Sequence, residues 1–152
     1  MRIPARRAIR YRTRIVADTP SSDVVTEGIR VQAAAQFVPD HSDPSRKHYQ
    51  YVYRIVLTNQ GQAPARLRTR HWVILDAHNE RREVRGDGVV GEMPHLQPGE
   101  TFHYESGCPL PTEWGTMEGS YEMERDDGER FQVAVGRFFL APSNPPILMG
   151  GE

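Results

Sequence analysis

Apolar and polar residues alternate along much of this chain with a period of two. The clearest stretch is 46–59, where aromatic and β-branched residues recur at every second position. One of its faces holds Tyr49, Tyr51, Tyr53, Ile55 and Leu57, and the other holds Gln50, Val52, Arg54, Val56 and Thr58. This period predicts a strand. A second strand is predicted over 26–38, where Ile29, Val31, Ala33, Ala35 and Phe37 share one face, and it is long enough to bend or bulge.

Turn sequences separate the extended segments. Gln97-Pro98-Gly99-Glu100 has the residues of a type II turn, and Asp126-Asp127-Gly128-Glu129 predicts a hairpin between 116–125 and 130–140. Asn59-Gln60-Gly61 ends the first strand, and residues 76–80 separate 66–76 from 81–90. The 13 glycines and 12 prolines leave few stretches for helices. About seven strands result, which favours an all-β antiparallel sandwich or barrel.

A local pattern around Tyr121 favours the sandwich. Glu118-Gly119-Ser120-Tyr121-Glu122-Met123 is laid out like the tyrosine corner of immunoglobulin-like domains, with Met123 at the position of the core cysteine. The alternative is that Tyr121 simply alternates on an ordinary strand. Strand 66–76 also leaves two alternatives. Trp72 shares a face with Arg66, Arg68 and Arg70, so either a bulge changes the register or the arginines lie beyond the sheet edge.

The charges divide the chain into unlike parts. It has 152 residues, the length of about one domain, and a formal net charge of -1. Six arginines and no acid occupy positions 1–14, so the remainder carries 13 basic and 20 acidic residues. We therefore expect a basic, flexible arm over 1–23, a sandwich domain over 24–141 and a Pro/Gly-rich tail over 142–152. An acidic body is not expected to bind nucleic acid sequence-specifically.

The compartment is expected to be the cytoplasm. The single cysteine, Cys108, precludes an intrachain disulfide, and no stretch resembles a secretory signal or a membrane span. An organellar transit peptide is the alternative for the Arg-rich start, but serine is scarce there and Pro4 interrupts a helix. Cys108 lies between Gly107 and Pro109, which indicates a half-buried loop residue rather than a nucleophile.

The segment Gly86-Asp87-Gly88-Val89-Val90-Gly91 matches the dinucleotide-binding pattern G-x-G-x-x-G. That pattern needs a following helix, whose amides hold the pyrophosphate, and Pro94 and Pro98 preclude one here. A strand end or a loop close to other backbone is favoured. The alternative is a small anion-binding loop formed by Arg85, Gly86, Asp87, Gly88 and Gly91, with Arg82 nearby.

Other chemistry has weaker support. The six histidines show no ligand spacing, so we expect no structural metal and no cofactor. Glu122, Glu124 and Asp126 alternate on one strand, which suits Mg²⁺ but is more typical of a solvated face. Arg66, Arg68 and Arg70, together with the arm and Tyr11, offer at most a weak, salt-sensitive phosphate contact.

Four blocks in order resemble the ApaG family across most of 24–141. They are Arg70-His71-Trp72-Val73-Ile74, Glu83–Gly91, Pro98-Gly99-Glu100 with Tyr104-Glu105-Ser106-Gly107, and Gly115–Met123. The resemblance implies a fibronectin-type-III-like or immunoglobulin-like sandwich in the bacterial cytoplasm. Family members carry a label of cobalt and magnesium resistance, and eukaryotic members are joined to an F-box subunit or a polymerase-delta-interacting protein.

These properties imply a non-catalytic module that binds a protein partner not yet identified and is not itself a transporter. Two other partners stay open: a small ligand at Gly86–Gly91, such as pyrophosphate, a dinucleoside polyphosphate or a divalent cation, and a second copy in a homodimer. We expect no membrane contact.

Overall fold

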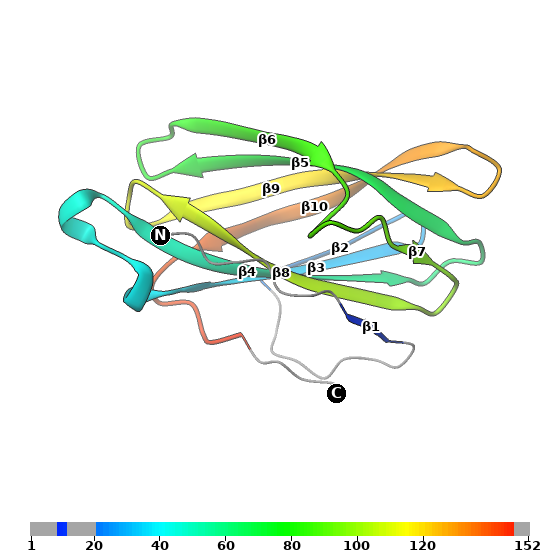
Figure 1. Cartoon of the computed structure of the whole chain (residues 1–152), viewed down its shortest axis with the longest axis horizontal. Helices are drawn as coiled ribbons and strands as arrows, with labels where there is room; N and C mark the ends of the chain where they lie inside the picture. Colours follow the sequence, from blue (N-terminus) through cyan, green and yellow to red (C-terminus); the bar gives the residue numbers. More distant parts are fainter. Residues whose placement is uncertain (1–8, 12–20, 148–152) are drawn as a thin grey trace.

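The computed structural model describes residues 9–11 and 21–147 of the chain. In this part the backbone forms ten strands and two short 3-10 helices, η1 and η2 (Figure 1). The strands are β1 (Ile9–Tyr11), β2 (Ser22–Thr26), β3 (Ile29–Phe37), β4 (Tyr49–Asn59), β5 (Ala65–Asp76), β6 (Arg81–Asp87), β7 (His95–Leu96), β8 (Thr101–Leu110), β9 (Gly115–Arg125) and β10 (Arg130–Leu140). The helices η1 (Pro39–His41) and η2 (Pro44–Arg46) lie between β3 and β4.

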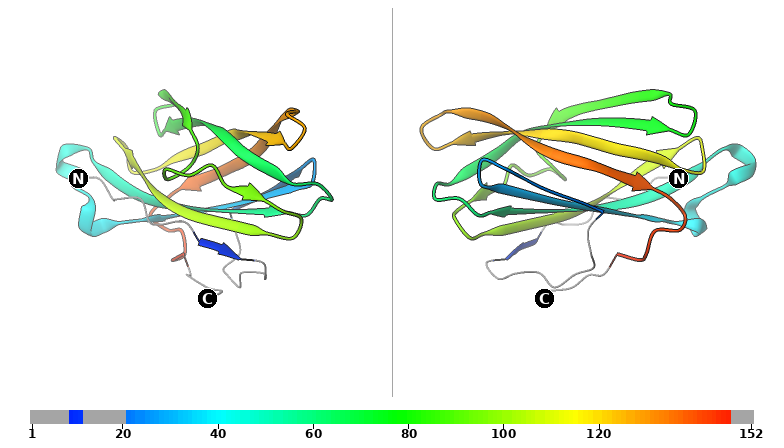
Figure 2. Two further views of the ribbon diagram at one scale, coloured as in Figure 1. Left: turned by 45° about the vertical axis from the view of Figure 1, so that its right-hand side comes forward. Right: turned by 180° about the vertical axis from the view of Figure 1, so that it is seen from behind.

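The strands form two antiparallel sheets packed as a sandwich. The first sheet has the order β1-β8-β4-β3-β2 and the second has the order β10-β9-β5-β6, with β7 paired to β5. The two layers are visible from both sides in Figure 2. The prediction of an antiparallel β-sandwich is confirmed. The predicted strand at 26–38 becomes β3, which pairs with β2 and β4 without a register shift, and the short β1, β2 and β7 are additions.

Alternation places the core as the sequence predicts. In β4 the side chains of Tyr51, Ile55 and Leu57 have no exposed surface, and they face the second sheet. Trp72 on β5 packs edge-on against Tyr53 of the first sheet, with ring centroids 5.4 Å apart. Met123 is fully buried, so the core is filled by aromatic and aliphatic side chains without a disulfide.

A bulge in β5 decides between the two alternatives for that strand. The register with β9 shifts between Leu67 and Thr69, so Arg68 is the extra residue. The shift allows Leu67 and Trp72, five positions apart, to be buried together. Trp72 therefore points inward, and Arg70 lies on the same side of β5.

The tyrosine corner predicted at Tyr121 is wrong. Tyr121 lies in the middle of β9, and its hydroxyl meets the hydroxyl of Tyr104 on the opposite sheet at 2.5 Å instead of the upstream backbone. Both side chains are buried, with 0% and 3% of their surfaces exposed. Burial raises the pKa of both phenols well above the ordinary value, so the pair is neutral.

The predicted turns have the expected conformations. Gly99 has φ +88°, and the amide of Glu100 donates to the carbonyl of Gln97, which completes the type II turn. Gly128 has φ +92° in the hairpin between β9 and β10. Both glycines occupy the left-handed region that other residues rarely adopt.

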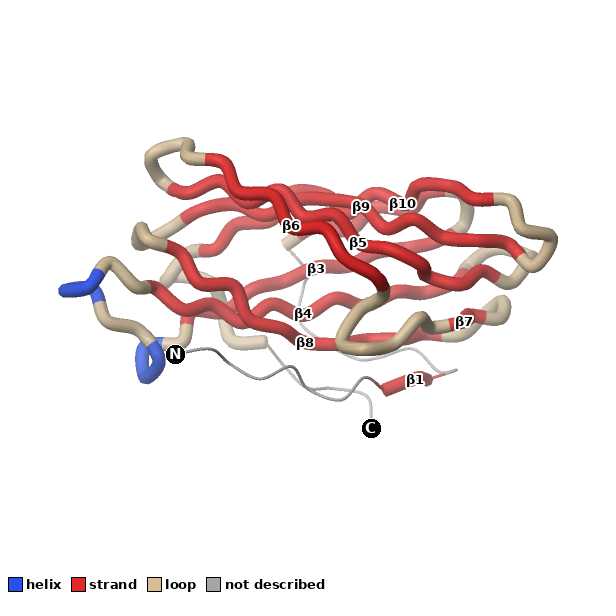
Figure 3. Tube along the Cα trace, turned by 45° about the horizontal axis from the view of Figure 1, so that its top comes forward, coloured by secondary structure: helices blue, strands red, loops and turns tan. Residues whose placement is uncertain are grey.

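The two sheets approach closely at the β10 and β2 edges. The amide of Ala134 donates to Oγ1 of Thr26, and a Cβ on Gly136 would lie 2.8 Å from Val24. The other edge of the second sheet is β6, at the top of the molecule in Figure 1 and in front in Figure 3. In the described part of the chain, β6 pairs only with β5. One edge of this sheet is thus closed and one is open.

The predicted division into an arm, a sandwich domain and a tail stays a prediction. The structure adds some detail near both chain ends. Residues 9–11 of the proposed arm form β1 and pair with β8, and β2 begins at Ser22. Residues 1–8 and 12–20 lie outside the described part. On the C-terminal side, Asn144 donates to the carbonyl of Ala35, and the amide of Ile147 donates to Gln36. Among the described residues, no helix is long and apolar enough to cross a membrane.

Candidate functional site

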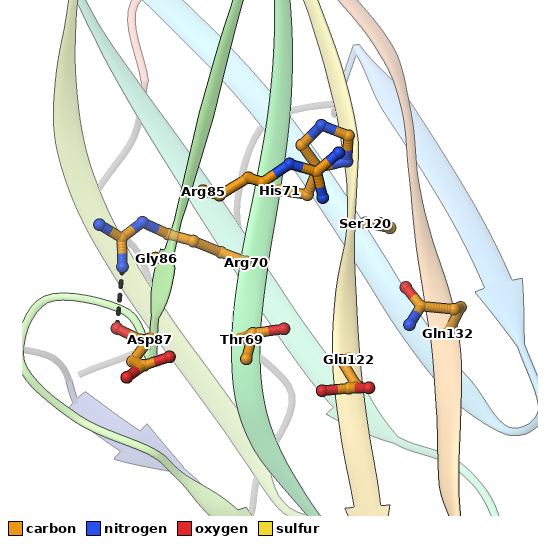
Figure 4. A pocket seen from close by; sticks show the side chains of 9 residues that line it. All are labelled: Thr69, Arg70, His71, Arg85, Gly86, Asp87, Ser120, Glu122 and Gln132. Atoms are coloured by element: carbon orange, nitrogen blue, oxygen red, sulfur yellow. Dashed lines mark hydrogen bonds between the residues drawn. The ribbon is translucent and has the colours of Figure 1, made fainter.

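A polar hollow of about 470 Å³ lies on the outer face of the second sheet. All four strands of that sheet contribute to it (Figure 4). Its lining consists of Thr69, Arg70, His71, Arg85, Gly86, Asp87, Ser120, Glu122 and Gln132. The volume lies within the range of about 300–1,000 Å³ that is usual for ligand sites, but such sites are mostly apolar. This hollow is therefore more typical of a polar docking surface.

Charged groups at the rim are already paired with one another. His71 Nε2 lies 2.7 Å from Oε1 of Glu83, and Arg81 donates to the other carboxylate oxygen at 3.0 Å. Hydrogen bonds from His71 and Arg81 lower the pKa of Glu83. Arg85 lies 3.6 Å from the same carboxylate, and Glu122 accepts from Arg130 at 2.8 Å. The rim thus carries both signs of charge.

Uncharged polar side chains occupy the middle of the hollow. Thr69, Ser120 and Gln132 come from β5, β9 and β10 and line its surface. In the described part of the chain, these three side chains form no hydrogen bond with other residues. Gln132 is exposed, and in Figure 4 its amide lies beside Glu122. Their donors and acceptors are available to a bound molecule.

The sequence did not single out these three residues or His71. Each is a polar residue at an outward position of a strand, and such residues are common on any solvated sheet face. Only the register of two strand pairs, β5 with β9 and β9 with β10, brings them together. Ser120 lies opposite His71, and Glu122 lies opposite Thr69. Alternation within one strand gives no information about which neighbour lies beside it.

Arg70 passes beneath β6 and ties it to β5. Its Nη1 donates to the carbonyl of Asp87 at 2.9 Å (Figure 4) and to the carbonyl of Gly88, also at 2.9 Å. Gly86 lies directly over the guanidinium, because a Cβ there would be 2.7 Å from Nη2 of Arg70. A side chain at position 86 would displace the guanidinium of Arg70 from this place.

The rest of the glycine motif forms a tight turn, and no helix follows it up to residue 147, where the described part of the chain ends. Gly88 has φ +62°, and a Cβ on it would lie 2.4 Å from the carbonyl oxygen of Glu92. Val90 and Gly91 also have positive φ, at +43° and +80°, as in a type I′ turn. The favoured structural interpretation, a strand end with a close backbone approach, agrees with this geometry.

The five predicted loop residues divide into two groups. Arg85, Gly86 and Asp87 line the hollow, whereas Gly88 and Gly91 lie in the turn beyond it. The amide of Gly88 donates to Arg68, and Val89 and Glu92 exchange their amides and carbonyls. These three amides are therefore not available to an anion, although the proposed ligand site as a whole stays a prediction.

The alternating carboxylates each contact a base. Glu122 pairs with Arg130, Glu124 lies 3.5 Å from Arg68, and Asp126 lies 2.8 Å from Nε2 of His95. Such contacts between side chains are typical of the solvated face that the sequence favours over a Mg²⁺ site. Among the described residues, no three His, Cys, Asp or Glu side chains are grouped so that they could hold a metal ion.

Cys108 and the arginines of β5 have internal contacts. The prediction that Cys108 lies in a loop is wrong. Cys108 lies within β8, with 2% of its surface exposed. Burial raises the pKa of its thiol to about 11, and Arg82 only partly offsets this. Arg66 donates to the carbonyl of Met93. The predicted phosphate contact through Arg66, Arg68 and Arg70 would therefore compete with bonds within the fold.

Comparison with known proteins identifies the family. The model of the ApaG domain matches residues 39–125. A Protein ApaG of Anaeromyxobacter dehalogenans is 52% identical over 119 residues, which cover 78% of this chain and 94% of that protein. Protein ApaG of Aromatoleum aromaticum is 51% identical over 113 residues, covering 74% and 89% of the two chains. A crystal structure of a Bordetella pertussis protein described as ApaA is 46% identical, with a TM-score of 0.74, covering 76% and 94%. The chain belongs to the ApaG family.

Proposed function

We propose that the protein is a non-catalytic module of the cytoplasm that binds a protein partner on the outer face of its second sheet. The observation that carries this proposal is the polar hollow. Thr69, Ser120 and Gln132 offer uncharged donors and acceptors, and Arg85 and Glu122 flank them with opposite charges. A polypeptide segment with polar and charged side chains fits this chemistry. The mostly polar lining makes an apolar ligand a poor fit.

The rim charges support binding rather than catalysis. The imidazole of His71 is held by Glu83 at 2.7 Å, and in the described part Ser120 makes no hydrogen bond to it. A nucleophile activated by a base needs that bond. The cobalt and magnesium resistance with which the family is labelled would, under this proposal, act through the bound partner.

Photocrosslinking in cells tests the proposal. A photoreactive amino acid at Gln132, in the hollow, should give discrete crosslinked proteins. The matched control is Gln62, an exposed glutamine in the loop after β4. Adding Arg85→Glu to the Gln132 variant should weaken the crosslinks. Equal patterns at the two glutamines, or none at Gln132, would contradict docking at the hollow.

A second candidate is a small anionic ligand, such as pyrophosphate or a dinucleoside polyphosphate. It is favoured by one observation: Arg85, Gly86 and Asp87 of the predicted ligand loop line the same hollow. Thermal unfolding with pyrophosphate, a dinucleoside polyphosphate, Mg²⁺ or Co²⁺ distinguishes it. Binding raises the free energy of unfolding as RT ln(1 + [L]/Kd). A flat response, identical in wild type and Arg85→Ala, would exclude the candidate.

A further inference from the structure

The open edge of the second sheet is the long, regular strand β6. It pairs with β5 over all of Arg81–Asp87 without a register shift. The opposite edge strand, β10, is interrupted by a bulge between Val135 and Phe138, and the amide of Ala134 is bound by Thr26. Bulges and covering contacts of that kind protect a sheet edge against pairing. In β6 neither device is present, and proline does not occur in it.

The backbone groups on the open edge belong to the odd-numbered residues. The amide of Asp76 donates to Glu80, and the amide of Gly88 donates to Arg68, so even-numbered residues of β6 face β5. Hydrogen-bonding direction alternates along an antiparallel strand. Arg81, Glu83 and Arg85 therefore direct their amides and carbonyls away from the sheet. By the same alternation the carbonyl of Asp87 is directed to this edge, where it also accepts a hydrogen bond from Arg70 of its own chain.

The charges of β6 are complementary to those of a second, antiparallel copy. If two copies pair about a two-fold axis at Val84, Arg81 lies opposite Asp87, and Glu83 lies opposite Arg85. The hydrogen-bonded positions are then the odd ones on both strands, as the edge requires. Arg82 of one copy would lie opposite Gly86 of the other, and the two Val84 residues would lie opposite each other. These pairs bring no two like charges together. A registry centred on Glu83 or on Arg85 instead places two residues of the same charge opposite each other.

The edge is also held in position within one chain. Arg82 points inward and donates to the carbonyl of Pro109 on the first sheet at 3.0 Å. Arg70 fixes the other end of the strand through Asp87. The pairing strand is thus preorganised, so little chain ordering opposes association.

We propose that β6 is a self-association surface, through which two copies join edge to edge with Val84 on the two-fold axis. The second sheets of the two copies then form one continuous antiparallel sheet. Glu83 and Arg85 form the central hydrogen-bonded pairs, and Arg81 and Asp87 pair through their side chains at the ends. This inference goes beyond the proposed docking function. The two hollows would lie on the same face of the joined sheet, on either side of the axis.

Sedimentation velocity over a concentration series tests the proposal. The wild-type chain should show a monomer–dimer equilibrium. Asp87→Arg and Arg81→Asp each place like charges opposite each other at two symmetric positions, and each should weaken the dimer by about tenfold or more. Glu129→Arg is the matched control, because it makes the same change of charge at an exposed turn residue away from β6. It should dimerise like the wild type.

Mixing the two variants tests the registry itself. In a pair of one Asp87→Arg chain and one Arg81→Asp chain, both end contacts become Arg–Asp again. An equimolar mixture should therefore form heterodimers where neither variant alone dimerises. Circular dichroism and melting temperature show that each variant is folded.

Three results would overturn the proposal: a wild-type monomer at every concentration, single variants that dimerise as strongly as the wild type, or a mixture that stays monomeric. None of them depends on crosslinking at Gln132, so failure here is distinguishable from failure of the docking proposal.

Discussion

The hydroxyl pair of Tyr104 and Tyr121 joins the two sheets inside the core, and its removal is the most quantitative test of the structure. The two oxygens are 2.5 Å apart, and both residues are almost fully buried. Tyr121→Phe leaves the Tyr104 hydroxyl buried without this partner. Such a group costs about 1–3 kcal/mol, far more than the small loss of volume. Tyr104→Phe should cost about the same for the same reason.

The double variant distinguishes this account from simple loss of two groups. With both hydroxyls removed, no polar atom of the pair is left unsatisfied, and the cost should be no larger than that of either single change. The coupling energy of the double-mutant cycle is therefore expected to be about 1–3 kcal/mol. For a chain of this size, each single variant should lower the melting temperature by roughly 2–12 °C.

Urea unfolding followed by tryptophan fluorescence measures these energies. Trp72 packs edge-on against Tyr121, with ring centroids 6.0 Å apart, so its emission reports on this part of the core. Tyr49→Phe is the control, because this half-buried tyrosine forms no hydroxyl bond in the described part of the chain. It should change stability by less than about 0.5 kcal/mol. Additive single effects, or a Tyr121→Phe variant as stable as the wild type, would refute the reasoning.

Three further predictions concern other parts of the fold. His103 is buried on β8, and burial, followed by the nearby Arg54 charge, lowers its pKa to about 4. The unfolded chain therefore binds this proton first as the pH falls below about 6.5, and stability should fall by up to about 3 kcal/mol between pH 6.5 and 4. Urea unfolding at several pH values measures this loss. The His103→Gln variant should lack it, so a variant whose stability depends on pH as strongly as that of the wild type would contradict the prediction. Gly88→Ala should cost more than about 2 kcal/mol, because φ is +62° and its Cβ would meet the Glu92 carbonyl, whereas Gly91→Ala, in open space at φ +80°, should cost about 1 kcal/mol. Equal losses in thermal unfolding would count against the close approach at Gly88. Since the pKa of Cys108 is raised to about 11, a thiol reagent at pH 8 should react slowly with the native protein and fast with the urea-unfolded chain, and equal rates would show that the thiol is accessible.

Much of the sandwich follows from local sequence, because period-two alternation and turn chemistry are short-range properties. The Tyr-rich strand, the turn at Pro98-Gly99 and the hairpin at Gly128 lie where the sequence predicts them. The inserted residue Arg68 does not follow from the pattern, although it reverses the faces of everything after it in β5. Strands of two or three residues, such as β1 and β7, are too short to show any period.

The lining of the hollow follows from the sequence only in part, for a related reason. Gly86 and Asp87 belong to the contiguous glycine motif, and Arg85 directly precedes it. Thr69, Ser120 and Gln132 belong to three strands, and only their pairing brings them together. The partner of the Tyr121 hydroxyl was missed for the same reason, since Tyr104 is on the opposite sheet. Contacts between distant segments are set by the packing of the whole domain.

The glycine motif also has a structural cause that requires no bound nucleotide. At Gly86 the Arg70 guanidinium occupies the space that a side chain would fill, so a larger residue would displace it. Glycine is required at Gly88, because the backbone of Glu92 lies against it. In a dinucleotide site, glycines bring the backbone close to a pyrophosphate. Here Gly86 brings the backbone close to an arginine of the same chain, and that arginine fixes the end of β6. The positions that resemble a ligand site thus build the straight, open edge on which the proposed pairing of two copies depends.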